Sequence, residues 1–213
     1  MSKWFDTNYH YLVPECHAND TFNLNPELLL EEIRAGLEQT KQVKPVILGP
    51  LSYLYLARSV DGCDRLELLA PLLAVYEELL ATIKAEGVEW VQIDEPILVL
   101  DLPEAWLNAF ESTYQSLATA HLNILISTYF GGLENNLSRV FELPVQGVHL
   151  DIVSAPEQLA PSLALLKPTQ VLSLGIINGR NIWRSDLTAS YQLLAPLASQ
   201  LKERLWIATS CSL

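Results

Sequence analysis

The sequence predicts an α/β fold built as a (β/α) barrel that is incomplete, with about six parallel strands covered by helices. Short runs rich in Val, Ile and Leu alternate with longer amphipathic stretches along the 213 residues. Polar residues follow nearly every short run, as expected where barrel strands end at one rim. A doubly wound sheet is the alternative, but only the strands beside its switch point would carry such residues. A complete barrel has eight strands, so the chain is either an open sheet or a piece of a barrel.

Residues 1–43 precede the repeating units and are expected to form a loop segment followed by one helix. Lys3–Tyr11 is polar and aromatic, which favours a loop or a short hairpin arm. Pro26–Thr40 has helical periodicity. Asn25 is expected to cap this helix, with Pro26 in its first turn, where the missing amide has no intrahelical partner.

Residues 44–213 are expected to form repeating βα units, within one domain that spans residues 1–213. The predicted strands are Lys44–Gly49, Trp90–Asp94, Asn123–Ser127, Gly147–Asp151, Val171–Ile176 and Leu205–Thr209. The predicted helices between them are Arg65–Glu86, Pro103–Thr119, Leu133–Glu142, Pro156–Leu166 and Asp186–Glu203. Gly87 marks the end of the longest helix, where a left-handed residue is favoured.

The composition is that of a densely packed protein and excludes several classes. Half of the residues are hydrophobic and 18% are charged, which excludes a disordered chain. A formal net charge of −12, with the 13 Lys and Arg residues spread out, argues against nucleic acid as a partner. Apolar runs are too short for a membrane helix, and the amino terminus lacks the pattern of a signal peptide. We therefore expect a cytoplasmic protein with no membrane partner.

The cysteines and histidines do not form a recognisable metal or disulfide motif. Cys16, Cys63 and Cys211 are an odd number at wide spacings, so we expect reduced thiols. The histidines have no His-x-His or i, i+4 pairing. His149, on an apolar strand, is predicted to be a hydrogen-bonded core residue.

Two adjacent carboxylates mark the end of one predicted strand. The run Glu89–Pro96 leads an apolar strand into Asp94 and Glu95, and the following proline prevents the ladder from continuing. Ligands bind at such strand ends in parallel α/β proteins, so the pair is a candidate site. An independent small (β/α) enzyme or binding protein would use these carboxylates. The structural alternative makes Asp94 a strand-end hydrogen-bond acceptor and Glu95 a counterion for a helix or loop.

Five stretches spread along the chain resemble cobalamin-independent methionine synthase. These are Lys3–Tyr11 (KWFDTNYHY), Lys44–Pro50 (KPVILGP), Trp90–Pro96 (WVQIDEP), Asn178–Arg184 (NGRNIWR) and Ala208–Leu213 (ATSCSL). The resemblance covers essentially the whole chain and points to the amino-terminal one of two TIM-type (β/α)8 barrels that lie face to face. It implies a fragment of that domain in which the first two strands are missing.

The resemblance also implies an activity for the parent protein. The parent transfers a methyl group from 5-methyltetrahydropteroyl-polyglutamate to homocysteine. A zinc ion in its carboxyl-terminal barrel binds homocysteine as the thiolate. The expected partners of this chain are therefore that catalytic barrel and the methyltetrahydrofolate polyglutamate. Open sheet edges also favour self-association.

The resemblance assigns roles to a few residues. Lys3 is expected to bind the glutamate tail of the folate, and Asp94, Glu95 and Arg180 are weaker candidates. Asp151 and Cys211 occupy vestigial zinc-ligand positions, but Ser127–Tyr129 replaces the other two ligands, so no metal is expected in this chain. Arg180 stands where the catalytic barrel has a proton-donating histidine, and a guanidinium does not act as a general acid. No catalytic residue is therefore expected, and the chain alone is predicted to be inactive.

Overall fold

Six parallel strands form the main sheet of the computed structural model, which describes residues 1–5, 7–40 and 42–211. The strands are β4 (Val46–Leu48), β6 (Trp90–Asp94), β7 (Asn123–Ser127), β8 (Gly147–Asp151), β9 (Val171–Ile177) and β10 (Leu205–Thr209). They lie in the sheet in the order of the chain, from β4 at one edge to β10 at the other. This order lacks the reversal of a doubly wound sheet, and it confirms the barrel-type prediction with six strands.

The sheet is curved, as in a barrel. The ring centroids of Trp90 on β6 and Trp206 on β10 lie 4.7 Å apart, although these strands are not neighbours in the sheet. Gly147 on β8 leaves room for Leu125 on the same face, because a Cβ at that position would lie 2.8 Å from Leu125 Cδ1. Side chains on the inner face of the sheet therefore meet across its concave side.

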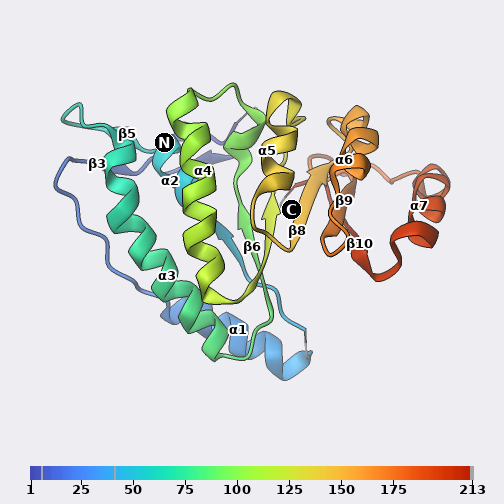
Figure 1. The fold of residues 1–213 in the computed structure, drawn as a ribbon, viewed down its shortest axis with the longest axis horizontal. Helices are drawn as coiled ribbons and strands as arrows, with labels where there is room; N and C mark the ends of the chain where they lie inside the picture. The colour runs from blue at the N-terminus through green and yellow to red at the C-terminus, as the bar shows by residue number, and fades with distance from the viewer. Residues whose placement is uncertain (6, 41, 212–213) are drawn as a thin grey trace.

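Seven helices accompany the described strands. They are α1 (Glu27–Gln39), α2 (Pro50–Leu56), α3 (Leu69–Ala85), α4 (Glu104–Leu117), α5 (Leu137–Glu142), α6 (Leu159–Leu165) and α7 (Leu187–Leu201). Short 3₁₀ turns are η1 (Arg65–Leu68), η2 (Pro96–Val99), η3 (Ala118–Ala120), η4 (Glu134–Asn136), η5 (Pro156–Gln158) and η6 (Lys202–Arg204). Helices α3, α4, α5 and α6 lie along one side of the sheet, and α7 stands apart at its far end (Figure 1).

The predicted helices are confirmed in place, with three differences in detail. The first turns of several predicted helices are 3₁₀ rather than α-helical, and α2 was not predicted. The expectation for Asn25 was wrong, because Pro26 is the residue that precedes α1 and no side chain caps it. The backbone of Pro26 is itself helical, with φ −93° and ψ −3°, so Pro26 lies in the first turn as expected and only the cap is missing.

The hydrophobic core lies between the sheet and its helices. Alternate strand residues point to opposite faces of a sheet. Fully buried residues of the four central strands form the outer face, beneath the helices: Val91, Ile93, Ile124, Ile126, Val148, Leu150, Leu172 and Leu174. Toward the carboxyl ends of the strands the inner face carries polar side chains instead, so this part of the face holds the candidate site.

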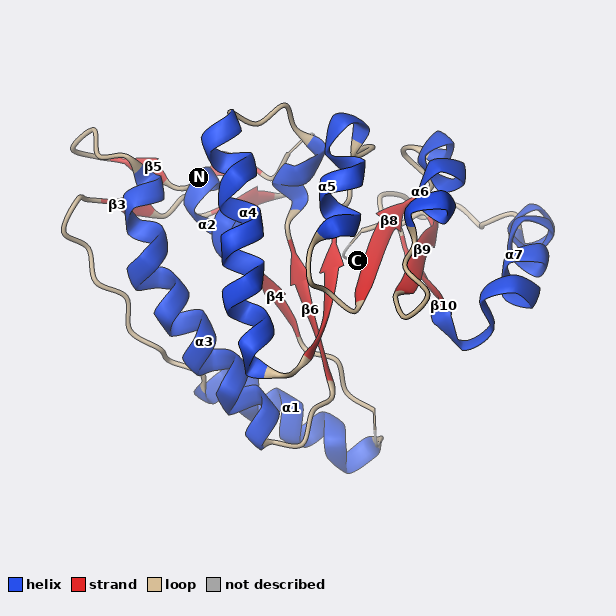
Figure 2. Ribbon diagram, viewed as in Figure 1, coloured by secondary structure: helices blue, strands red, loops and turns tan. Residues whose placement is uncertain are grey.

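A short amino-terminal arm lies at the end of the sheet toward which the strands point (Figure 2). Strands β1 (Ser2–Lys3) and β2 (His10–Tyr11) pair antiparallel, which confirms the predicted hairpin arm. Strand β3 (Glu15–Cys16) pairs in parallel with β5 (Arg58–Ser59), a contact that the sequence did not predict. The arm is also held by the Tyr11 hydroxyl, which donates to the Leu56 carbonyl at 3.0 Å.

The helices show no membrane-spanning character. Across the described ranges, none is long and apolar enough to cross a bilayer.

Candidate functional site at the carboxyl ends of the strands

A row of polar side chains crosses the inner face of the sheet. The strand register places Asp94, Ser127, His149 and Ser173 side by side on β6, β7, β8 and β9. A hollow of about 410 Å³ is lined by three of them, Asp94, Ser127 and His149. Lys44 and Tyr129 also line it. The parallel register therefore collects the polar strand-end residues at one place, as a barrel rim does.

Asp94 already has hydrogen-bond donors at both carboxylate oxygens. Gln92 Nε2 donates to Oδ1 at 2.8 Å, and the Tyr129 hydroxyl donates to Oδ2 at 3.2 Å. Lys44 Nζ donates to the Gln92 side-chain oxygen, so a chain of contacts joins Lys44 to Asp94. Burial raises the pKa of Asp94, while Gln92, Tyr129 and Lys44 oppose that shift. This arrangement favours the interpretation of Asp94 as a strand-end acceptor.

Glu95 points to the opposite face from Asp94 and is fully buried. Its Oε2 accepts a hydrogen bond from the Ser52 amide at 2.8 Å, and its Oε1 accepts one from the Leu51 amide at 3.4 Å. These amides belong to the first turn of α2, which an acidic group stabilises. Gly49 makes this contact possible, because a Cβ there would lie 2.1 Å from Glu95 Cδ.

The two adjacent carboxylates therefore do not share a site. Successive residues of a strand face opposite sides of the sheet, so one faces the inner hollow and the other faces the helices. Burial raises the pKa of Glu95 to about 7, with hydrogen bonds from Ser52 and Leu51 opposing the shift. The structure does not support an enzyme that uses both carboxylates on one substrate.

Asp151 holds two loops together through backbone amides. Its Oδ1 accepts from the Val153 and Ser154 amides at 3.0 and 2.8 Å, and its Oδ2 accepts from the Phe130 amide at 3.1 Å. Both oxygens of this fully buried carboxylate are thus used within the protein. Its role in the structure is to shape the loops after β7 and β8.

The donor set near Asp151 and Cys211 does not fit a zinc site. Cys211 is a buried thiol whose pKa is raised by burial. Ser127 and Tyr129, which the resemblance sets at the other ligand positions, offer only hydroxyl groups. Among residues 1–5, 7–40 and 42–211, no three His, Cys, Asp or Glu side chains are grouped so as to hold a metal. Zinc needs at least three protein ligands.

His149 is a hydrogen-bonded core residue, as predicted. Its Nδ1 lies 2.9 Å from the Ser173 hydroxyl, and the side chain is buried. Burial lowers its pKa to about 4. The imidazole is therefore neutral at physiological pH and belongs to the packing of the inner face.

Lys3 and Arg180 share a second hollow, of about 330 Å³, at the same end of the sheet. Its lining residues are Lys3, Thr7, Asn8, Tyr9 and Arg180. Lys3 comes from the hairpin arm, whereas Arg180 follows β9. Both cations are exposed side chains. The structure therefore brings together two of the predicted site residues from opposite ends of the chain.

An aromatic contact that sequence reasoning missed positions this second hollow. The Phe5 ring of the arm lies 5.8 Å from the Phe130 ring, which follows β7. The Arg180 guanidinium lies 5.5 Å from the centre of the Phe130 ring, within the range of a cation–π contact. The sequence signal for this contact was Phe130, an aromatic residue that directly follows the Ser127–Tyr129 strand end.

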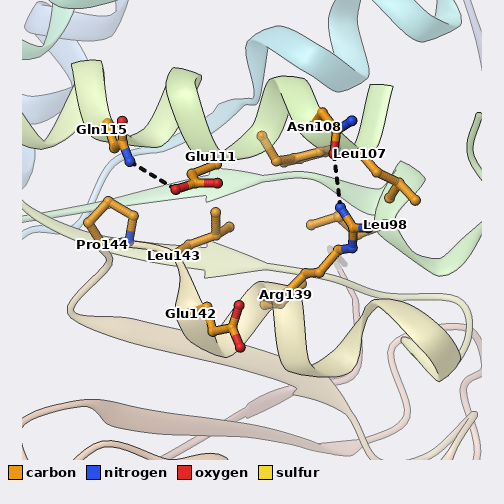
Figure 3. A pocket seen from close by; sticks show the side chains of 11 residues that line it. Leu98, Leu107, Asn108, Glu111, Gln115, Arg139, Glu142, Leu143 and Pro144 are labelled. Carbon is orange, nitrogen blue, oxygen red and sulfur yellow. Dashed lines mark hydrogen bonds between the residues drawn. The ribbon is translucent and has the colours of Figure 1, made fainter. Parts of the chain in front are cut away.

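A third hollow, of about 470 Å³, lies between α4 and α5 on the helix layer (Figure 3). Its polar side chains contact one another: Arg139 donates to Asn108 at 3.2 Å and to Glu104 at 2.8 Å. Gln115 likewise donates to Glu111 at 3.1 Å. This groove belongs to the helix packing and lies away from the strand-end residues.

Comparisons with known proteins concern the sequence and the fold of the chain. Residues 1–202 match the model of the family described as cobalamin-independent synthase, N-terminal domain. The chain is 51% identical over 214 aligned residues to the 5-methyltetrahydropteroyltriglutamate–homocysteine methyltransferase of Vibrio vulnificus. That alignment covers all of this chain but only 27% of the relative.

Solved structures show the same fold. A putative vitamin-B12 independent methionine synthase from Listeria monocytogenes superposes with a TM-score of 0.68 at 16% identity, covering 92% of this chain and 66% of that chain. A B12-independent methionine synthase from Shewanella sp. W3-18-1 gives a TM-score of 0.72 at 15% identity, covering 86% of this chain and 59% of that chain. At these identities the likeness concerns the fold alone.

Proposed function

Because the chain belongs to the cobalamin-independent synthase family, whose N-terminal domain it matches over residues 1–202, we propose that it is part of a methionine-forming methyltransferase. The parent would transfer the methyl group of 5-methyltetrahydropteroyl-polyglutamate to homocysteine. This chain would form one wall of the folate cleft, and the carboxyl-terminal barrel, with its zinc ion, would be its catalytic partner. A cytoplasmic location and a single domain over residues 1–213 belong to the same proposal.

The observation that carries the proposal is the hollow shared by Lys3 and Arg180. A folate polyglutamate tail is a flexible series of carboxylates, and it suits cations at more than one point. The formal net charge of the chain is −12, so an anion can approach only where local cations reverse the sign. Asn8 and Tyr9 add polar groups to the same lining.

The strand-end carboxylates support a non-catalytic role for this chain. Asp94 and Asp151 have hydrogen-bond donors at both oxygens, and Glu95 is buried against α2. A general acid or base must reach the reacting group of a substrate. Asp94 lines the inner hollow, but both of its oxygens already accept hydrogen bonds within the protein.

Calorimetric titration of the purified chain with methyltetrahydrofolate triglutamate, in the presence of homocysteine, tests this proposal. We expect binding without methionine formation. Lys3→Ala should weaken binding roughly fivefold, the effect of losing about 1 kcal/mol from an exposed charge contact. Added salt should reduce the difference between the two proteins.

Lys84→Ala is the matched control, because Lys84 is an exposed lysine at the end of α3, outside both strand-end hollows. Equal affinity of the Lys3 and Lys84 variants would contradict the role given to Lys3. Methionine formation by the chain alone would contradict its non-catalytic role.

A further inference from the structure

Two cysteines that are far apart in the sequence lie close together beside the arm. The parallel pairing of β3 with β5 sets Cys16 opposite Ser59, and paired residues of parallel strands point to the same face. The Ser59 hydroxyl donates to Cys63 Sγ at 3.4 Å, and Cys63 Sγ lies 4.0 Å from the Cys16 carbonyl oxygen. The Cys63 sulfur therefore lies on the side of the ladder to which the Cys16 side chain points.

The turn after β5 holds the two cysteines in this arrangement. Gly62 has a φ of +82°, which lets the chain reverse between Ser59 and Cys63. Asp61 accepts from the Cys63 amide at 3.1 Å and from the Ala18 amide at 2.9 Å. One carboxylate thus links the segment that carries Cys16 to the segment that carries Cys63.

We propose that Cys16 and Cys63 are a site of reversible disulfide modification by hydrogen peroxide. Both are thiols in the structure. Cys16 is buried, whereas Cys63 is half-buried, so peroxide reaches Cys63 first.

The reaction has two steps. The Cys63 thiolate attacks one peroxide oxygen; an S–O bond forms, the O–O bond breaks and hydroxide leaves, which gives a sulfenic acid. The Cys16 thiolate then attacks the Cys63 sulfur; the S–S bond forms, the S–O bond breaks and a second hydroxide leaves. The protons released by the two thiols convert both hydroxides to water. One peroxide is reduced, and two thiols are oxidised.

The second step should be the slower one at neutral pH. Burial raises the pKa of the Cys16 thiol, and the charge of Asp20 raises it further. The attacking thiolate is therefore scarce at neutral pH and becomes more abundant as the pH rises.

The cross-link would fasten the amino-terminal arm to the segment that follows α2. These segments already touch, since the Arg58 amide donates to the Pro14 carbonyl at 2.8 Å and the Val60 amide donates to the Cys16 carbonyl at 3.0 Å. A disulfide closes the loop between residues 16 and 63, which restricts the unfolded chain. The expected rise in Tm is roughly 5 °C or more.

The test is peroxide treatment of the reduced 213-residue chain, followed by thiol counting, intact mass and peptide mapping. We expect two of the three thiols to be lost, a mass lower by two hydrogens, a peptide that links Cys16 to Cys63, and reversal by dithiothreitol. Cys211→Ser keeps the pair and should give the same linked peptide and the same rise in Tm. Cys63→Ser should give neither.

Other oxidation patterns would overturn the proposal. One is oxidation of Cys63 to a sulfinic acid while Cys16 keeps a free thiol. The other is a Cys63 that links only to a second chain. A treated protein with three intact thiols would overturn it equally.

Discussion

The end of β6 shows how one step along a strand changes the environment of a carboxylate. Asp94 faces the inner hollow, where Gln92 and Tyr129 donate to it. Glu95 faces the helices and receives the first amides of α2. The two residues have the same chemistry, but alternation along the strand separates their roles.

Glu95 should make the stability of the protein depend on pH. Its pKa in the folded protein is about 7, above the ordinary value of 4.5, so the folded state binds the proton more tightly. The stabilisation is present below about pH 4.5 and is lost as the pH rises to about 7, by up to about 3 kcal/mol. Glu95→Gln should remove this component, as measured by urea unfolding at acidic and neutral pH.

Glu38→Gln is the control for that experiment, since Glu38 is an exposed carboxylate on α1. It should leave the pH dependence of the unfolding free energy as in the wild type. If the Glu95 variant keeps the full pH dependence, the buried carboxyl does not bind its proton in the way described.

The stability of helix α7 depends strongly on the residues at its ends. Exposed apolar side chains lie along its first half, including Leu187 and Tyr191, and only Leu197 and Leu201 are buried. Figure 1 shows it apart from the helices that cover the sheet. A helix with so little packing relies more on its cap.

Asp186 supplies that cap. Its Oδ1 accepts from the Thr188 and Ala189 amides, both at 3.0 Å. Asp186→Ala should destabilise α7 by about 1 kcal/mol, which amide hydrogen exchange would detect as roughly fivefold faster exchange within the helix. Asp186→Asn retains a capping oxygen and should exchange like the wild type. Equal exchange in the two variants would show that the cap does not control the helix.

At the scale of the whole molecule, the sheet has two open edges. Strands β4 and β10 are the two edge strands of the sheet. Each carries an apolar residue that is more than half exposed, Val46 at 52% on β4 and Ile207 at 60% on β10. Unpaired backbone groups beside exposed apolar side chains favour pairing between chains.

We therefore expect the chain to self-associate, with an average mass in sedimentation velocity that rises with concentration. Ile207→Lys places a charge on the β10 edge and should shift the protein toward monomer. Leu28→Lys alters an exposed leucine on α1, which belongs to neither edge strand, and should not. A wild-type protein that stays monomeric at high concentration would refute the expectation.

Regular elements were predictable because their signals are local. The six strands and the long helices repeat an apolar pattern with a fixed period, and each is long enough to show it. Strands β3 and β5 have two residues each, and α2 begins at a proline after a strand. A strand of two residues is too short to show a period.

By itself, the sequence determined the succession of strands and helices, the family resemblance and the presence of carboxylates at strand ends. Only the tertiary structure decided that Asp94 and Glu95 face different layers, that Lys3 meets Arg180 and that Cys63 lies against Cys16. The hydrophobic period of a strand or helix depends only on residues that are close together in the sequence. Contacts between distant residues depend on how whole elements pack, because curvature of the sheet and docking of the arm place side chains that no local pattern connects.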